Sequence, residues 1–499
     1  MIQEHLSLLI VVIPLLAAPI AAILPNGRLP WLFSTLVCWV IFYLAGTQLV
    51  NVIALSTPEA GGVISYALGN WAPPIGIELR IDSANALVAL IVAGVAAIAM
   101  PYAYASVVNE IPEKQSALFY SAFLLCLTGL LGITLTGDIF NLFVFLEISS
   151  LSSYALISMG KNRQALTASY QYLIMGTIGA TFFLIGVGLL YSMTGSLNMA
   201  DLSQRLPDIF ENRTVHTAFA FIMIGIALKL AMFPLHLWLP NAYTYAPSIV
   251  TIFLAATATK VAVYVMIRII FSVFNLHIVE STPTDELFLL LGMAGVIAAS
   301  ITAIYQTNAK RLFAYSSVAQ IGYMVLGIGF GSVLGLTASF VHVFNHAIMK
   351  AALFMALGAI MYRIGSNQLA DMRGLARKMP WTFGAFVIGG LSLIGVPGTA
   401  GFISKWYLVL AALEQQAWIV IAVILTGSLL AVAYVWKLVE ILYFNPVSEA
   451  NTDNVKEAPL SLLLPLWLLV IANIYFGIDT SLTVGVAEPA ANMLLGGKP

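Results

Sequence analysis

Residues 215–240 read VHTAFAFIMIGIALKLAMFPLHLWLP, an apolar stretch long enough to cross a membrane that carries a lysine and two prolines. Pro234 has no N–H for the carbonyl of Leu230, so that oxygen is freed beside Lys229. We therefore predict a broken helix, interrupted at Pro234 and Pro240. Irregular backbone at membrane depth survives only where it is packed in protein or lines a wet cavity, so the break indicates a functional interior.

A second interrupted span reads SLIGVPGTAGFISKW at 392–406, where Pro397 and Gly398 precede Lys405. The two breaks lie five predicted spans apart. A five-helix unit repeated in tandem must have the opposite orientation in its second copy. Broken helices at corresponding positions therefore indicate an inverted-repeat transporter. Two ordinary proline kinks are the alternative interpretation.

The composition places the whole chain in the membrane. Hydrophobic residues make up 61% of it and charged residues only 9%, against about 25% charged in a soluble domain. Scanning for apolar stretches predicts an all-α, polytopic membrane protein with about fourteen transmembrane helices, of which the seventh and twelfth are broken. The net charge of −1 indicates no basic surface for nucleic acid, and the chain has no soluble domain to hold a cofactor.

We expect four parts along the chain. Residues 1–116 hold three helices and an external loop, 55–83, whose alternating and turn-forming residues could make a small hairpin. The remaining parts are the first five-helix repeat at 117–274, the second five-helix repeat at 286–444, and a last helix with its tail at 445–499.

The distribution of basic residues predicts the orientation. Loops after odd-numbered spans carry most of the lysines and arginines outside the spans, among them Lys114, Arg373 and Lys378. By the positive-inside rule these loops are cytoplasmic. Both termini are then expected outside.

Ionisable side chains lie deep inside five of these spans. A charge at the centre of a spanning helix costs ~2.5–3.5 kcal/mol, so five cost on the order of 12–17 kcal/mol together. So large a cost calls for a compensating arrangement and usually a function. The five residues are Glu147, Lys229, Lys260, Lys350 and Lys405.

Glu147 is the plausible partner of Lys229, because an opposite charge within ~4–6 Å stabilises both groups. Such a pair is either a switch for proton transfer or a static salt bridge. Lys260 has no acid on its own helix, so it can accept and release a proton. Arg268, near the outer end of the same span, is expected to extend towards the membrane surface.

His342, His346 and Lys350 recur every four residues in VHVFNHAIMK and form a ladder along one helix face. Histidine titrates near neutral pH and suits a proton relay. We predict no metal site, because no carboxylate or cysteine stands at ligand spacing from these histidines. Asp138, at the edge of the fifth span, is a further polar candidate.

Four segments carry a family resemblance. They resemble the antiporter-like subunits shared by Mrp-type cation/proton antiporters and respiratory complex I, over about residues 80–445. The segments are KLAMFPLHLWLPNAYTYAPS at 229–248, which contains His236, RLFAYSSVAQIGYM at 311–324, NHAIMKAALF at 345–354 and GTAGFISKW at 398–406.

The resemblance implies roles for the buried groups. Glu147 matches the family's essential glutamate of helix five, and Lys229, Lys260 and Lys405 match its ionisable residues of helices seven, eight and twelve. The histidines and lysine of the ladder match its helix-eleven motif. The family then implies proton transfer parallel to the bilayer, from the Glu147–Lys229 pair to Lys260, then along the ladder, and last to Lys405. We expect His236 and Asp138 to be supporting polar residues.

Within the family the chain is most similar to the D-type member of the Mrp antiporter. That similarity implies partner subunits of types A, B, C, E, F and G, transport of protons and sodium ions, no cofactor, and a bacterial cytoplasmic membrane. Three alternatives stay open. They are a proton-pumping subunit of a redox complex such as NADH:quinone oxidoreductase or a membrane-bound hydrogenase, a free-standing solute transporter, and a structural membrane anchor.

Overall fold

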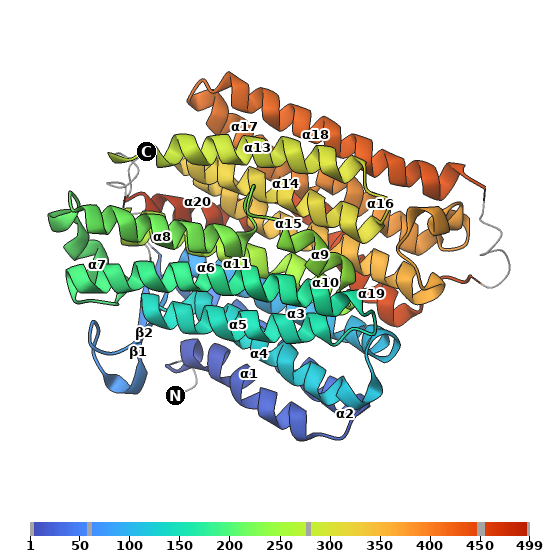
Figure 1. Cartoon of the computed structure of the whole chain (residues 1–499), viewed down its shortest axis with the longest axis horizontal. Helices are drawn as coiled ribbons and strands as arrows, with labels where there is room; N and C mark the ends of the chain where they lie inside the picture. The colour runs from blue at the N-terminus through green and yellow to red at the C-terminus, as the bar shows by residue number, and fades with distance from the viewer. Residues whose placement is uncertain (1–3, 57–61, 276–280, 447–454, 497–499) are drawn as a thin grey trace.

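The computed structural model describes residues 4–56, 62–275, 281–446 and 455–496, and most of them are helical. The long helices lie side by side, along the longest axis of the molecule (Figure 1). In chain order the helices are α1 (Leu6–Ile23), α2 (Arg28–Leu55), α3 (Ser83–Glu110), α4 (Ser116–Leu135), α5 (Ile139–Ser158), α6 (Gln164–Thr194), α7 (Met199–Arg205), α8 (Arg213–Leu230), α9 (Trp238–Tyr245), α10 (Ser248–Ala256), α11 (Ala258–Arg268), α13 (Thr284–Ile304), α14 (Ala309–Gly329), α15 (Val333–Ile364), α16 (Pro380–Ile394), α17 (Ala400–Glu414), α18 (Trp418–Val439), α19 (Leu460–Ile478) and α20 (Thr483–Leu494).

Within the described ranges, thirteen helical segments are long and apolar enough to cross a membrane. One more expected span is divided into α16 and α17, each of 15 residues. Together these segments confirm the prediction of an all-α membrane protein that spans the bilayer about fourteen times. The division of the chain into four parts at the predicted residues stays a prediction.

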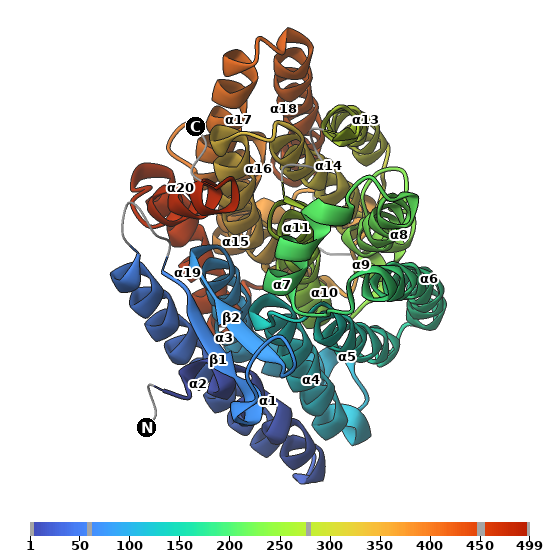
Figure 2. The ribbon, with the colours of Figure 1, turned by 90° about the vertical axis from the view of Figure 1, so that its left-hand side faces the viewer.

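The expected external hairpin is present. β1 (Ile64–Ala67) pairs antiparallel with β2 (Glu78–Ile81). The buried Glu78 carboxylate accepts hydrogen bonds from Ser65, at 2.5 Å, and from Asn198 beside α7, at 2.8 Å. These bonds tie the hairpin to α7. Both elements lie at the same end of the molecule as α20 (Figure 2).

The two halves of the bundle share local backbone details. Asp138 and Asn198 form an isolated bridge between the starts of α5 and α7, and Asn308 and Gln368 form the same bridge at the start of α14. The second bridge follows the first at a constant separation of 170 residues. The long helices in between, α6 and α15, each end at a left-handed glycine. This correspondence is what a tandem repeat of five helices requires.

Both predicted broken helices are observed. α8 ends where Ala231 adopts a left-handed conformation, and α16 ends in the same way at Gly395. Pro234 and Pro397 lie in the irregular segments that follow, and the chain resumes as α9 and α17. The prediction of a break at Pro240 is wrong. Pro240 lies in the first turn of α9, where the backbone N–H would have no helical partner and a proline is tolerated.

A third break, at Thr257, was not predicted. It separates α10 from α11 within one apolar stretch, with backbone angles φ −124° and ψ −57°. The Thr257 hydroxyl donates to the carbonyl of Phe253 at 2.6 Å. Neither proline nor glycine marks the position in the sequence, so no breaker signal could have indicated it.

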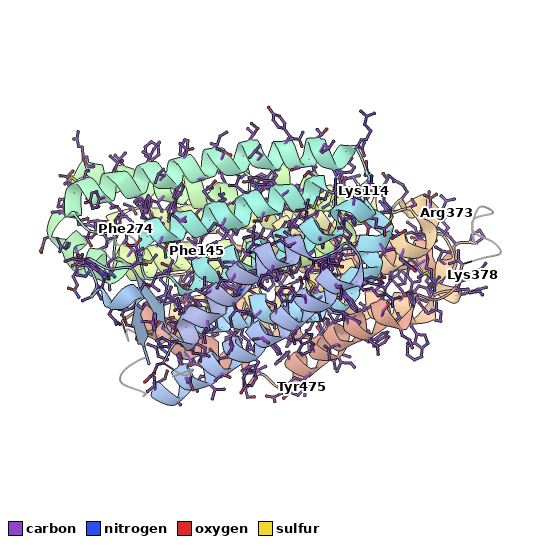
Figure 3. All side chains as sticks on the ribbon, turned by 90° about the horizontal axis from the view of Figure 1, so that it is seen from below. Lys114, Phe145, Phe274, Arg373, Lys378 and Tyr475 are labelled. Atoms are coloured by element: carbon purple, nitrogen blue, oxygen red, sulfur yellow. The ribbon has the colours of Figure 1, made fainter. Side chains whose placement is uncertain are left out.

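The basic residues of the odd-numbered loops gather at one end of the bundle. Lys114, Arg373 and Lys378 lie towards the same end, whereas Phe274 lies towards the other (Figure 3). The loops that were assigned to one side of the membrane therefore share one side of the fold. That this side is cytoplasmic stays a prediction.

Close packing of small residues holds α6 against α8. A Cβ atom added at Gly225 would lie 2.6 Å from the carbonyl oxygen of Gly179 and 2.8 Å from the backbone nitrogen of Phe183. Neither atom can move without displacing a helix. Small residues are the usual means by which membrane helices approach closely.

We therefore expect Gly225→Ala to destabilise the protein by about 1–3 kcal/mol, as overpacking does. Gly188→Ala, on α6, is the matched control, because no atom lies within 4 Å of its added Cβ. Thermal unfolding of the purified protein in detergent measures the difference. Equal unfolding temperatures for the two variants would contradict the close packing.

Candidate functional site

The first buried pair joins α5 to α8, as predicted. Lys229 Nζ lies 3.4 Å from Glu147 Oε1 and donates to Ser150 Oγ at 2.6 Å. The Lys229 side chain is 8% exposed and that of Glu147 is 28% exposed. The lysine is therefore held inside the bundle, while its carboxylate partner reaches the lateral surface of this chain.

The break after Lys229 is stabilised by side chains and not by a continued helix. The indole of Trp238 donates to the carbonyl of Leu228, in the last turn of α8, at 2.9 Å. His236 lies in the irregular segment, stacked on Phe233 with ring centroids 5.3 Å apart. Its Nδ1 atom is buried without a hydrogen-bond partner in the protein. His236 thus belongs to the break, and no contact with Lys229 is observed.

Lys260 is fully buried and follows the unpredicted break at Thr257. Its ammonium donates to the carbonyl of Ala255, in the last turn of α10, and to the hydroxyl of Thr259 at 3.3 Å. The non-helical backbone at Thr257 accompanies this contact with the Ala255 carbonyl. An oxygen of the protein backbone, in place of a carboxylate, holds the central lysine.

A small cavity lies between Lys229 and α11. Its volume is about 20 Å³, enough for the centre of one water molecule. The polar part of its wall comes from α5 and α8, and α11 supplies the opposite wall. Among the residues that line it are Lys229, Ser149, Ser150, Ser153, Ala258 and Ala262.

The ladder on α15 is completely buried. The rings of His342 and His346 are nearly parallel, with centroids 5.9 Å apart. His342 Nδ1 is hydrogen-bonded to Ser404 Oγ on α17 at 2.7 Å. Lys350 donates to the carbonyl of Phe313, at 2.8 Å, and to the hydroxyl of Ser316. The ladder therefore connects α14 to α17.

Several polar atoms beside the ladder have no partner in the protein. Both ring nitrogens of His346 are in this state, as are His342 Nε2, Asn345 Oδ1 and Gln320 Oε1. Buried polar groups in native proteins are nearly always hydrogen-bonded, either to protein or to ordered water. The interior around α15 is therefore polar enough to hold water.

Lys405 occupies the second predicted break. Its ammonium donates to the carbonyls of Leu393 at 3.1 Å and Ile394 at 2.8 Å, and to Ser428 Oγ at 3.1 Å. The two carbonyls belong to the end of α16, where the helix dipole favours a positive charge. The ammonium also lies 4.9 Å from the centre of the Tyr323 ring.

These groups lie near enough to one another for their positive charges to repel. Lys260 interacts with His346 and with Lys350, and Lys405 interacts with His342. Lys229 lines the small cavity that separates the Glu147–Lys229 pair from α11. We call the residues predicted for proton transfer the buried row; they are Glu147, Lys229, Lys260, His342, His346, Lys350 and Lys405.

Asp138 lies outside this row. Its carboxylate accepts a hydrogen bond from the Asn141 N–H at 2.7 Å and caps the N-terminus of α5. The observed contact is that of a helix cap. Among the described residues, no group of three histidines, cysteines or carboxylates could hold a metal ion.

One charged pair was missed. Arg268 does not extend to the membrane surface as expected, because its guanidinium binds Asp82 with two N–O distances of 2.8 Å. Asp82 lies just before the third predicted span, and Arg268 lies near the end of the eighth. Their opposite charges at that depth were the only sign in the sequence that they could pair. Sequence alone does not say that those two spans are neighbours.

The fold is that of a polytopic membrane protein. A family model described as NADH:quinone oxidoreductase/Mrp antiporter, TM matches residues 136–431. The N subunit of the NADH-quinone oxidoreductase of Desulforudis audaxviator is 42% identical over 486 residues, which cover 95% of this chain and 96% of that protein. The D-type component of the Na+/H+ antiporter of Alkalihalophilus pseudofirmus is 31% identical over 437 residues, 87% of each. The chain belongs to this family.

Two solved structures have the same fold over almost the whole chain. A chain of the membrane-bound sulfane sulfur reductase, an archaeal respiratory membrane complex, is 31% identical with a TM-score of 0.89, over 98% of both chains. A chain of the Mrp complex from a Dietzia species is 27% identical with a TM-score of 0.85, over 99% of this chain and 98% of that one. The resemblance seen in the sequence is therefore confirmed, and the similarity extends to both branches of the family.

The cap geometry gives a test that separates the role of Asp138 from that of the buried row. We expect Asp138→Asn to fold normally and Asp138→Ala to lose about 0.5–2 kcal/mol of stability, because asparagine caps a helix and alanine does not. Thermal unfolding and ion transport of the purified complex measure both effects. A folded Asp138→Asn variant that fails to transport would show that the carboxylate itself carries protons.

Proposed function

We propose that this chain is a proton-translocating subunit of a multisubunit membrane complex. The observation that carries the proposal is the row from Glu147 to Lys405. Its amines and imidazoles are buried in one interior, where each lysine bonds to protein oxygens. A static structural role would favour acid–base pairs, yet only Lys229 has a carboxylate partner among these lysines.

In this proposal protons move along the row and water fills the gaps between side chains. The cavity between Lys229 and α11 has room for one such water. Separation of Glu147 from Lys229 removes the opposite charge that stabilises the ammonium, and the proton then passes towards Lys260. The histidines relay it to Lys405. Protons enter through one five-helix repeat and leave through the other.

The exposure of Glu147 supports a partner subunit on that face. A carboxylate near the middle of a spanning helix is costly to leave against lipid. We propose that a neighbouring subunit covers the α5 face and continues the polar row. The cation path then lies largely on partner subunits, because Glu147 is the one carboxylate in this row and a hard cation requires several oxygen ligands.

Different relatives support two ways of driving proton movement, one by electron transfer and one by cation exchange. The 42% identical relative and the structure with a TM-score of 0.89 both belong to respiratory complexes, which supports a redox-driven pump. The 31% identical antiporter relative and the Dietzia complex support a monovalent cation/proton antiporter. For that coupling we propose partner subunits of types A, B, C, E, F and G. We further propose a bacterial cytoplasmic membrane with both termini outside. Neither coupling requires a cofactor in this chain.

The proposal predicts the effect of removing the ionisable groups. Glu147→Ala, Lys229→Ala and Lys405→Ala should each lower proton transport by the assembled complex by at least ~100-fold, the scale of a lost acid–base group, without loss of expression. Lys114→Ala is the control, because Lys114 lies at the exposed end of the bundle. A pH-sensitive dye in proteoliposomes reports the flux. Wild-type rates in all three variants would refute the mechanism.

The same proteoliposomes can distinguish a sodium gradient from electron transfer as the energy source for proton movement. An imposed sodium gradient should drive proton movement if the complex is an antiporter. A reduced electron donor with its acceptor should drive it if the complex is a redox pump. Proton movement under neither condition would refute both couplings.

A further inference from the structure

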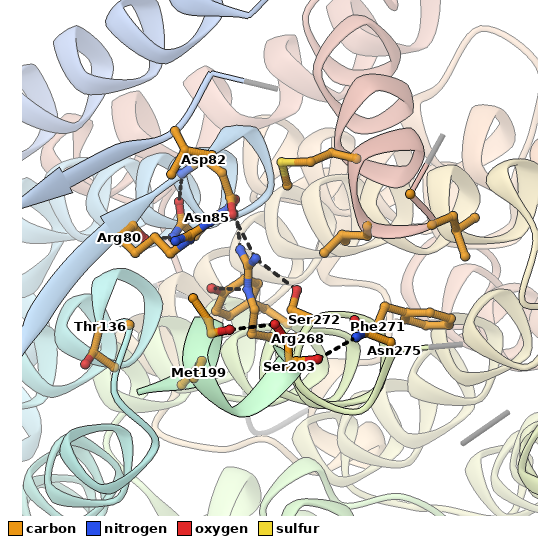
Figure 4. Close-up of a pocket in the computed structure, with 18 residues that line it drawn as sticks. Arg80, Asp82, Asn85, Thr136, Met199, Ser203, Arg268, Phe271, Ser272 and Asn275 are labelled. Carbon is orange, nitrogen blue, oxygen red and sulfur yellow. Dashed lines mark hydrogen bonds and ion pairs between the residues drawn. The ribbon is translucent and has the colours of Figure 1, made fainter. Parts of the chain in front are cut away.

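A wide cavity lies away from the buried row. Its volume is about 440 Å³, within the range of ligand sites in proteins. Residues of α7, α20, the end of β2 and the end of α11 line it (Figure 4). The hairpin, α7 and α20 lie at one end of the molecule (Figure 2), and the cavity opens there.

The floor of this cavity is the buried ion pair of Arg268 and Asp82 (Figure 4). The two side chains are 10% and 3% exposed. Arg268 Nε donates to the hydroxyl of Tyr264 at 3.0 Å, and its Nη1 donates to Ser272 Oγ at 3.2 Å. Asp82 also caps α3 by accepting from the Asn85 N–H at 3.1 Å. The pair therefore lies in the lining of the cavity, next to Tyr264, which also lines it.

One face of α11 leads from this floor to the central lysine. Arg268, Tyr264 and Lys260 follow one another at four-residue spacing, so each step is about 6 Å along the helix. The Tyr264 hydroxyl donates to the carbonyl of Thr134 at 3.1 Å. This is the same spacing as that of the ladder on α15. It gives the described chain a second polar stripe, which points from Lys260 to the cavity.

We propose that this cavity is an aqueous vestibule through which protons pass between the water at this end and Lys260, with the Arg268–Asp82 pair as its closing contact. The inference rests on the proposed function. In the inward direction a hydronium ion and the neutral Lys260 amine become water and the Lys260 ammonium. The outward step is the reverse, and no electrons are transferred.

The chemistry of the lining favours water over a bound metal ion. Asp82 is the one carboxylate among the lining residues, and both of its oxygens already bind Arg268. A metal cation would find no second carboxylate there, and Arg80 and Arg268, which both line the cavity, would repel it. Ser203, Ser272 and Asn275 are among the other polar residues of the wall and suit water.

Cysteine modification tests the vestibule. Ser203 lines the cavity from α7, whereas the next residue, Gln204, is exposed and does not line it. The two native cysteines, Cys38 and Cys126, are buried and give little background. Ser203→Cys and Gln204→Cys complexes in proteoliposomes would be treated with a membrane-impermeant, cationic methanethiosulfonate, and labelling would be measured by mass spectrometry.

We expect both variants to be labelled and proton flux to fall about ten-fold in Ser203→Cys only, because a fixed positive charge lowers the local hydronium concentration. A neutral methyl methanethiosulfonate should lower the flux of Ser203→Cys less. Failure to label Ser203→Cys, or equal flux before and after its cationic modification, would overturn the vestibule. Unmodified complex that moves no protons would instead refute the proposed function.

Discussion

The structure depends on one constraint, which is that an ammonium group inside an apolar bundle must be surrounded by oxygen atoms. The interior carbonyls of a continuous helix already accept backbone hydrogen bonds, so breaks in helices are the main local source of further acceptors. Lys260 uses the carbonyl of Ala255 at one break, and Lys405 uses the carbonyls at the end of α16 at another. Lys350, far from any break, donates to the Phe313 carbonyl, which it shares with the hydroxyls of Ser316 and Ser317, and to the Ser316 hydroxyl.

The two halves of the bundle apply this constraint in different ways on a similar backbone. Both α8 and α16 end in a left-handed residue. Lys229 precedes its break, so it is held by the Glu147 carboxylate and Ser150. Lys405 follows its break, so the freed carbonyls hold it instead. The row of ionisable groups therefore has a paired acid at one end and backbone oxygens at the other.

Local chemistry explains which features could be predicted. The breaks near Pro234 and Pro397 were predictable because proline removes a backbone donor wherever it stands. Pro240 misled the same reasoning, since a proline in the first turn of a helix removes nothing that the helix uses. The break at Thr257 contains no proline or glycine. Its observed local contact is the hydrogen bond from the Thr257 hydroxyl to the Phe253 carbonyl. Arg268 was misassigned for a related reason, as its partner Asp82 lies on another helix.

The sequence by itself determined that the chain spans a membrane many times, which ionisable groups lie inside the spans, and that His342, His346 and Lys350 share one face. These features depend on composition and on the 3.6-residue helical repeat, both of which are local. Only the tertiary structure decided that Glu147 meets Lys229 across 82 residues, that Ser404 meets His342 across 62, and that cavities lie beside the row and above Arg268. Which helices become neighbours depends on how whole apolar faces pack together. Because these faces are nearly uniform in composition, no single segment of the sequence indicates its neighbour.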